Sequence, residues 1–201
     1  MTKVSLMVIG TGHEPIPPRL YGGVEEHIFH LIYGLLNNSY RVLLIDINKK
    51  DRVDMPRLRK LKTFGDLFVR IEGRTSKCPV IRDIIFMIHA IRYCLTFKNI
   101  CHVILNFYDV LPLPLNIIIK TLSKKTIIYH TAAHDPWLIP TRKLTFGKKL
   151  AIILRTLNIR FSDFVTTPSD IMARRLISFA KPQRGITVSY THLTLPTTER
   201  V

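Results

Sequence analysis

The stretch Tyr21-Gly22-Gly23-Val24-Glu25-Glu26-His27 decides the fold of this chain. It follows an apolar segment typical of a buried strand, 4–9, and opens a helix, 24–36, whose apolar residues recur on one stripe. Two glycines at a helix start leave backbone N–H groups uncovered by side chains, at the positive end of the helix dipole. A strand, a glycine turn and a helix in this order predict a seat for an anionic ligand such as a diphosphate.

Strand-like and helical patterns alternate along the rest of the chain. Apolar or β-branched runs predict strands at 41–47, 67–71, 102–107, 125–130, 163–167 and 186–188. Amphipathic runs predict helices at 81–97, 112–122, 146–160 and 170–179. A basic, proline-containing stretch at 49–62 is predicted as a loop. The alternation predicts right-handed βαβ units, and so an α/β fold with a doubly wound, mostly parallel Rossmann-like sheet and helices on both faces.

The composition limits the size and the partners of the protein. A chain of 201 residues suits one large α/β domain or two small ones. Its 30 Lys and Arg residues against 14 Asp and Glu residues give a formal net charge of +16. Such a charge attracts nucleic acid, acidic lipid or phosphorylated substrates without choosing among them. The basic stretches lack interleaved aromatic residues and known nucleic-acid motifs, so no nucleic-acid partner is expected.

Cysteine usage and hydropathy predict a cytoplasmic protein. Cys78, Cys94 and Cys101 show no CxxC spacing, which predicts buried free thiols in a reducing compartment. No uninterrupted apolar run reaches about 18 residues, the length that a membrane-spanning helix needs. The first residues run straight into a strand without a signal-peptide pattern. Peripheral contact with the inner face of the membrane remains compatible with these features.

The end of the sequence has an unusual origin. Residues 188–197, Val-Ser-Tyr-Thr-His-Leu-Thr-Leu-Pro-Thr, are the literal translation of a DNA sequence that resembles a transposon-based sequencing adapter. We therefore expect natural coding sequence to run to about Thr187 and residues 188–201 to be an artefactual tail. His192, inside this tail, is given no functional weight.

Four patches occur in a familiar order. Gly22-Gly23-Val24-Glu25 opens the first helix, and Tyr40-Arg41-Val42 begins the next strand. Residues 126–131, Thr-Ile-Ile-Tyr-His-Thr, form a strand that ends in His-Thr, and residues 161–169 carry an Asp-Phe-Val-Thr-Thr-Pro-Ser strand before a helix. In this order and spacing, residues 1–187 resemble the N-terminal domain of retaining GT-B glycosyltransferases, the family-4-like group that includes sucrose synthases, bacterial mannosyltransferases and lipopolysaccharide sugar transferases.

The resemblance implies half of an enzyme. Residues 1–187 would be the acceptor-side domain, and the second domain, which binds the nucleotide sugar in that family, would be missing. The complete protein would transfer a hexose-type sugar from a nucleotide-diphosphate donor to a glycan, lipid or small-molecule acceptor. No cofactor is implied beyond the nucleotide sugar, which is a substrate. The chain alone is expected to be inactive and to bind nucleotide weakly.

The resemblance also implies roles for particular residues. Gly22 and Gly23 would approach the donor diphosphate and sugar, and His130 would be a catalytic residue that donates hydrogen bonds beside the reacting sugar. Candidates for acceptor binding are Glu25, Asp109, His134 and Asp135. For Glu25 a dipole-stabilising role in the first helical turn is an alternative, and Asp109 could equally be a solvated loop carboxylate. The run from His130 to Asp135 offers no third distal ligand, so no metal site is expected.

Two other functions stay open on the sequence. The basic amphipathic helix at 146–160 is either a solvated face or a docking element for an anionic membrane surface, which would make the chain a non-catalytic binding module. Asp46 ends a strand where NAD-dependent oxidoreductases keep a ribose-binding acid. However, Gly10-Thr11-Gly12-His13 departs from GxGxxG, and the helix begins more than ten residues too late for that motif.

Overall fold

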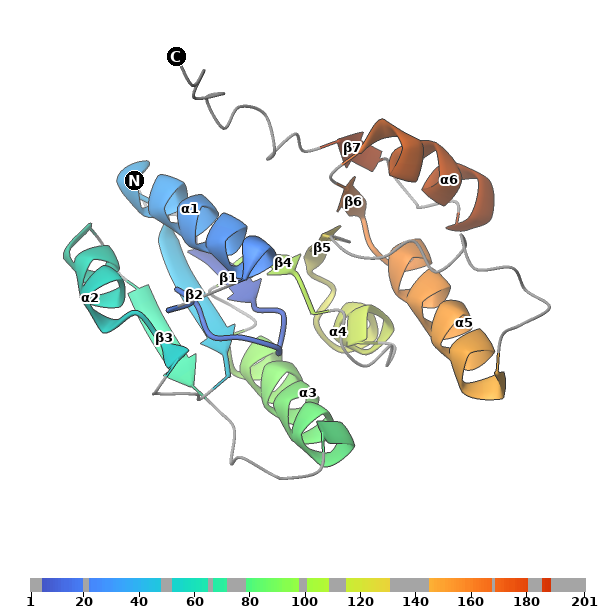
Figure 1. Cartoon of the computed structure of the whole chain (residues 1–201), viewed down its shortest axis with the longest axis horizontal. Coiled ribbons are helices and arrows are strands. Elements are labelled where there is room, and N and C mark those ends of the chain that lie inside the picture. The colour runs from blue at the N-terminus through green and yellow to red at the C-terminus, as the bar shows by residue number, and fades with distance from the viewer. Residues whose placement is uncertain are drawn as a thin grey trace, which may run out of the picture.

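The computed structural model describes residues 5–19, 22–47, 52–64, 67–71, 79–97, 101–108, 115–130, 145–167, 169–180 and 186–188. Its strands are β1 (Ser5–Ile9), β2 (Arg41–Asp46), β3 (Leu67–Ile71), β4 (Cys101–Asn106), β5 (Thr126–His130), β6 (Phe164–Thr167) and β7 (Ile186–Val188). Its helices are α1 (Gly23–Asn37), α2 (Met55–Phe64), α3 (Pro79–Thr96), α4 (Leu115–Ser123), α5 (Phe146–Arg160) and α6 (Asp170–Ala180). The described strands form one parallel sheet in the order β3-β2-β1-β4-β5-β6-β7 (Figure 1). The predicted doubly wound α/β fold is confirmed.

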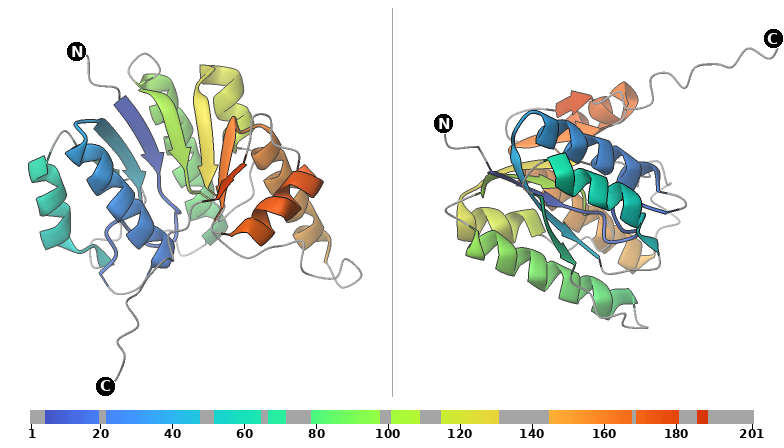
Figure 2. Two further views of the ribbon diagram at one scale, coloured as in Figure 1. Left: turned by 90° about the horizontal axis from the view of Figure 1, so that it is seen from above. Right: turned by 90° about the vertical axis from the view of Figure 1, so that its left-hand side faces the viewer.

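Alternate residues of the central strands pack against opposite helical layers. Val8 and Leu44 face α1 and α2, whereas Met7 and Ile45 face α3 and α4. This alternation follows from the period of two in an extended chain, and strands buried on both faces read as continuous apolar runs. Figure 2 shows α1 and α2 on one side of the sheet and α3 and α4 on the other.

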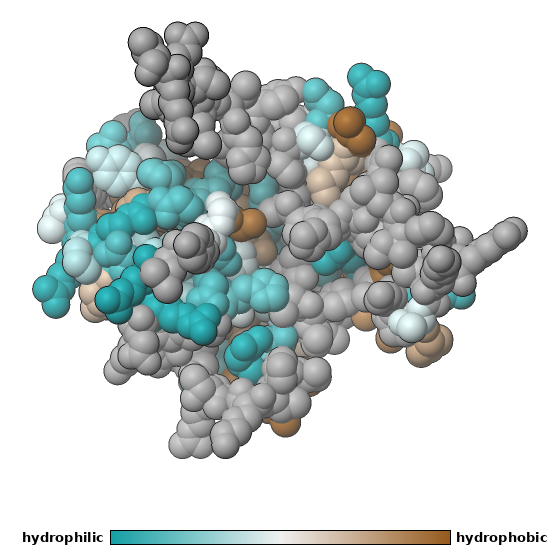
Figure 3. Space-filling view, viewed as in Figure 1, coloured by the Kyte–Doolittle hydropathy of each residue, from teal (hydrophilic) through white to brown (hydrophobic). Residues whose placement is uncertain are grey.

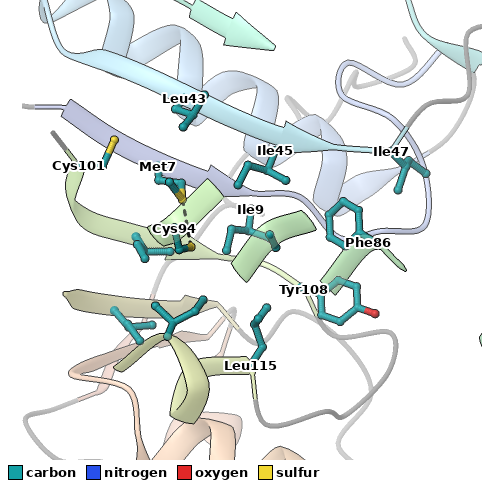
Figure 4. Close-up of a cluster of buried hydrophobic side chains, with 14 residues drawn as sticks. Met7, Ile9, Leu43, Ile45, Ile47, Phe86, Cys94, Cys101, Tyr108 and Leu115 are labelled. Carbon is teal, nitrogen blue, oxygen red and sulfur yellow. Dashed lines mark hydrogen bonds between the residues drawn. The ribbon is translucent and has the colours of Figure 1, made fainter. Parts of the chain in front are cut away.

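The α3 side of the core holds the two described cysteines. Cys94 and Cys101 are buried free thiols, as predicted, and Cys78 lies outside the described residues. The Cys94 thiol lies 3.3 Å from the sulfur of Met7 (Figure 4). Burial raises the pKa of Cys94 to about 12, so this side chain acts as a small apolar core residue.

The helices α5 and α6 complete the layer that α3 and α4 begin. Ile159 of α5 and Leu176 of α6 pack with Tyr129 and Val165. Because Tyr129 and Ile127 alternate onto the same face of β5, this contact lies on the α3 side of the sheet. Within the described residues, none of the helices is long and apolar enough to cross a membrane.

The prediction of a loop at 49–62 is wrong, because α2 occupies most of this stretch. Asp54 caps this helix, with its Oδ1 accepting a hydrogen bond from the Arg57 amide at 3.2 Å. Pro56 lies in the first turn, where its missing N–H costs nothing. Leu58 and Leu61 are buried against α1, and Arg57 pairs with Glu26 of α1 at 2.9 Å. The apolar stripe of α2 is narrow, and the many basic residues around it kept it from being recognised in the sequence.

A buried network of amides joins three elements behind the end of β4. The Asn116 side chain donates to the Asn158 carbonyl at 3.1 Å and to the Ser162 hydroxyl at 2.8 Å. Its carbonyl oxygen accepts from the Asn106 amide at 2.6 Å. Asn106 in turn accepts from the backbone N–H of Tyr108 at 2.9 Å. The network therefore fixes the path of the chain as it leaves β4.

Truncation of Asn116 is expected to be costly. The substitution Asn116→Ala removes the hydrogen bonds that the Asn116 side chain makes to buried groups of Asn106, Asn158 and Ser162. Each buried group left without its hydrogen bond costs about 1–3 kcal/mol. We expect the free energy of unfolding to fall by roughly 3 kcal/mol or more in urea denaturation. The matched change Asn38→Ala, at an exposed site that bonds to Gly34, should cost less than about 1 kcal/mol. Equal costs would contradict a special role for the network.

Candidate functional site

The order in which strands are added to the parallel sheet reverses between β1 and β4. From β1 the chain moves outward through α1 to β2 and β3, and it then returns through α3 to β4 on the other side of β1. At such a point the connections leave toward opposite faces, which opens a crevice at the carboxyl ends of the two strands. The Phe107 amide, just past β4, still bonds to the Ile9 carbonyl at the end of β1, 3.0 Å away.

The glycine pair lies at the start of α1 on this edge. Gly22 is the N-cap residue and forms no side-chain cap, so no side chain of the cap residue covers the first amides of the helix. A Cβ on Gly22 would lie 2.6 Å from the Glu25 carboxylate, whereas a Cβ on Gly23 would meet no atom within 4 Å. The packing therefore demands glycine at Gly22. At Gly23 it leaves open space over the helix N-terminus.

Glu25 turns into the protein. Its side chain is buried, and its Oε1 accepts a hydrogen bond from the hydroxyl of Thr11, in the loop that follows β1. This contact ties the loop to the first turn of α1 and so sets the position of the glycine pair. The carboxylate predicted to bind acceptor is thus engaged within the fold.

Three aromatic rings meet at the same edge of the sheet. His130 ends β5, and its ring centroid lies 5.0 Å from that of Phe107 and 5.4 Å from that of His27. His27 belongs to α1, one turn or about 6 Å along the axis from Gly23. The structure therefore brings the glycine turn and His130 to one place, with His27 between them.

His27 is a residue that the sequence reasoning missed. A signal was available, because position 27 is four residues after Gly23 and so shares its face of the helix. What the sequence did not show is the partner, since β5 lies about a hundred residues further along the chain.

The surroundings of His130 keep its ring neutral. The side chain is buried at 6% exposure, and its Nδ1 lies 2.8 Å from the hydroxyl of Thr166 on β6. Burial lowers the pKa of His130 to about 4, and the positive charge that His27 can carry acts in the same direction. With Nδ1 bonded to Thr166, Nε2 of the neutral ring is the nitrogen that can serve a ligand.

The remaining candidates are not part of this cluster as described. Asp109, His134 and Asp135 lie outside the described residues. Asp46 is buried, and its Oδ2 accepts from the Ile16 amide at 2.7 Å, which holds the loop after β1 in place. No group of three His, Cys, Asp or Glu side chains suited to a metal ion occurs among the residues that the structure covers.

Comparisons with known proteins bear on the fold. The chain superposes on a crystal structure of Arabidopsis thaliana UGT89C1 complexed with UDP, with a TM-score of 0.60 and 14% sequence identity. The match covers 96% of this chain and 53% of UGT89C1, so the chain spans about half the length of that GT-B glycosyltransferase. A GH113 beta-1,4-mannanase superposes at a TM-score of only 0.35, with 10% identity over 94% of this chain and 71% of the mannanase, which is too low to indicate a shared fold. No protein-family model and no curated protein sequence matches the chain.

The chain therefore has a Rossmann-like α/β fold that matches one half of the GT-B fold. At 14% identity the likeness establishes the architecture and leaves the chemistry to the site itself.

The two glycines should respond differently to alanine. Gly22→Ala forces a methyl group against the held Glu25 side chain and should lower the free energy of unfolding by about 1–3 kcal/mol. Gly23→Ala meets no atom and should leave that free energy unchanged or raise it by up to about 1 kcal/mol. Urea denaturation of both variants measures the difference. A large loss at Gly23 would show that its space is needed for packing.

His130 should make stability depend on pH. Its folded-state pKa of about 4 lies below the ordinary 6.5, so the unfolded chain binds the proton more readily between these values. The neutral His130 therefore makes its full contribution to the free energy of unfolding above pH 6.5. This contribution, about 3 kcal/mol in total, is lost as the pH falls toward 4.

Urea denaturation at pH 7.0 and pH 4.5 tests this dependence. His130→Gln should lose less stability than the parent chain between the two pH values. The matched variant His102→Gln changes an exposed histidine and should lose as much as the parent. Indistinguishable losses in all three proteins would contradict a buried, neutral His130.

Proposed function

We propose that residues 1–187 are the acceptor-side lobe of a retaining GT-B glycosyltransferase. The complete enzyme would transfer a hexose-type sugar from a nucleotide-diphosphate donor to a glycan, lipid or small-molecule acceptor. One observation carries the proposal. The uncapped N-terminus of α1 and the neutral His130 lie at one edge of a parallel sheet, joined by the ring of His27.

The chemistry of sugar transfer fits this pair. When the bond between the anomeric carbon and the diphosphate oxygen breaks, negative charge builds on the leaving diphosphate. Backbone amides at the start of α1 and the helix dipole stabilise such charge without reorganising. In the tautomer whose Nδ1 accepts from the Thr166 hydroxyl, the neutral His130 ring donates from Nε2 to a sugar hydroxyl or phosphate oxygen. The neutral ring carries no charge that would have to be desolvated.

The complete enzyme would contain two lobes. A second lobe would face the carboxyl edge of this sheet and hold the nucleotide, and its absence would leave the diphosphate bound from one side. The match to about half of UGT89C1, a protein solved with UDP, supports this division. We therefore expect negligible transferase activity from the 201-residue chain alone, and robust turnover would contradict the division into lobes.

A second partner is proposed for α5, an anionic membrane surface. Phe146, Leu150 and Ile153 form an exposed apolar stripe along this helix, and the Phe146 side chain is 83% exposed. Lys149 and Arg160 are exposed on the same helix. An apolar stripe flanked by cationic residues is typical of helices that lie in the headgroup region of a bilayer.

The alternative of an NAD-dependent oxidoreductase has less support. The carboxylate that would bind the ribose, Asp46, accepts a hydrogen bond from the Ile16 amide and so holds the loop after β1.

Titration with pyrophosphate and with UDP tests the proposed donor seat. Amide resonances of Gly22, Gly23 and Val24 should shift in nuclear magnetic resonance spectra of the labelled chain. The dissociation constant should be on the order of 1 mM or weaker, since only one side of the ligand is held. The ring resonances of His130 should shift in the same titration.

Two glycines of α1 provide the matched variants. An added Cβ meets no atom within 4 Å at either Gly23 or Gly34, so both positions have room for the first carbon of a valine side chain. Gly23→Val covers the first amides and should weaken pyrophosphate binding at least threefold, whereas Gly34→Val should leave it unchanged. Shifts confined to other parts of the chain, or equal binding by both variants, would overturn the proposed seat.

A further inference from the structure

The helices α3, α4 and α5 present one sign of charge to solvent. Together they contain seven basic residues, Arg82, Arg92, Lys120, Lys148, Lys149, Arg155 and Arg160. Their single acidic residue, Asp83, is buried and bonded to Arg82. Lys120 pairs with the buried Asp163, so the exposed cations that remain include Arg92, Lys149 and Arg160. No exposed acidic side chain interrupts them on these three helices.

The same three helices carry most of the exposed apolar side chains. Thirteen large hydrophobic residues are exposed among the described residues, and eight of them belong to these three helices. They are Ile81, Ile84, Ile88, Leu95, Leu122, Phe146, Leu150 and Ile153. On α3 they recur at intervals of three, four and seven residues, which places them on one stripe of the helix. Over α1 and α2 the surface is mainly hydrophilic (Figure 3).

The geometry joins these side chains into one surface. The helix α4 packs against both α3 and α5 and lies between them (Figure 1). In a parallel βαβ sheet each helix runs back against its strands, so helix N-termini lie at the carboxyl edge. Six of the eight exposed apolar residues fall in the first halves or at the middles of their helices, whereas Leu95 and Leu122 lie in the last turns of α3 and α4. The larger part of the apolar surface therefore lies toward the edge that holds His130.

We infer that the outer faces of α3, α4 and α5 together form a docking surface for an anionic membrane. The inference rests on the membrane contact proposed for α5 and extends it to α3, whose apolar stripe was not part of that proposal. Aliphatic side chains enter the headgroup region while the surrounding cations meet acidic lipid heads. Bound in this way, the carboxyl edge of the sheet is tilted toward the bilayer.

Charge argues for this occupant over a second copy of the chain. Two such faces brought together would place cations near cations, and the three helices carry no exposed carboxylate that would relieve this repulsion. Exposed isoleucine and leucine also contribute nothing to reading nucleic acid, whose binding sites use polar and aromatic groups.

Co-sedimentation of the 201-residue chain with vesicles tests the surface. Vesicles of phosphatidylcholine with phosphatidylglycerol should bind the chain, with affinity falling as salt rises, and phosphatidylcholine alone should bind at least tenfold less. Two double variants probe the face, Ile84→Glu with Ile88→Glu on α3, and Leu150→Glu with Ile153→Glu on α5. The control is Tyr40→Glu with Met55→Glu, which changes two exposed apolar residues by the same charge outside the three helices.

The α3 and α5 double variants should each lose at least tenfold in vesicle affinity relative to the control, with unchanged circular dichroism. Loss in the α5 variant alone would confine docking to α5 and overturn the inference while keeping the proposed α5 contact. Loss in neither would overturn both. A dimer in sedimentation velocity that the α3 variant dissolves, or competition by RNA equal to that by acidic vesicles, would assign the face to another partner and also overturn the inference.

Discussion

The reversal of strand order between β1 and β4 is the constraint on which the site depends. It sends α1 to one face of the sheet and α4 to the other, so neither helix covers the carboxyl ends of the two central strands. Into this gap come three groups far apart in the sequence, the glycine turn before α1, Phe107 after β4 and His130 at the end of β5. The contact between Thr11 and Glu25, and the amide network around Asn116, hold the two rims of the gap in place.

Periodicity was enough to predict most of the fold. Apolar and β-branched runs gave the strands at 67–71 and 186–188 with the bounds that the structure has, although both strands lie at the edges of the sheet. The helix α2 escaped prediction since its cap, Asp54, and its two buried leucines were outweighed by basic residues and a proline. A helix with a narrow apolar face gives a weak periodic signal, and its capping residue is then the better guide.

The site was predictable in its outline and not in its contacts. Gly22, Gly23 and His130 could be placed at the ends of elements from the sequence, and the parallel topology carries such ends to one edge. The buried position of Glu25 could not be foreseen, because its partner Thr11 lies in a loop without regular pattern. Nor could the meeting of His27 with His130, which depends on how two faces of the sheet are packed. Long-range side-chain contacts of this kind follow from the assembled layers, and local propensity does not encode them.

The most direct measurement is a crystal structure of the chain soaked with UDP. If backbone amides at the start of α1 and the neutral ring of His130 form half of a sugar-diphosphate site, the β-phosphate should lie within hydrogen-bond distance of the Gly23 or Val24 amide and on the same side as Nε2 of His130. Diphosphate bound among the exposed cations of α3 and α5, with the start of α1 occupied by solvent, would contradict that central claim.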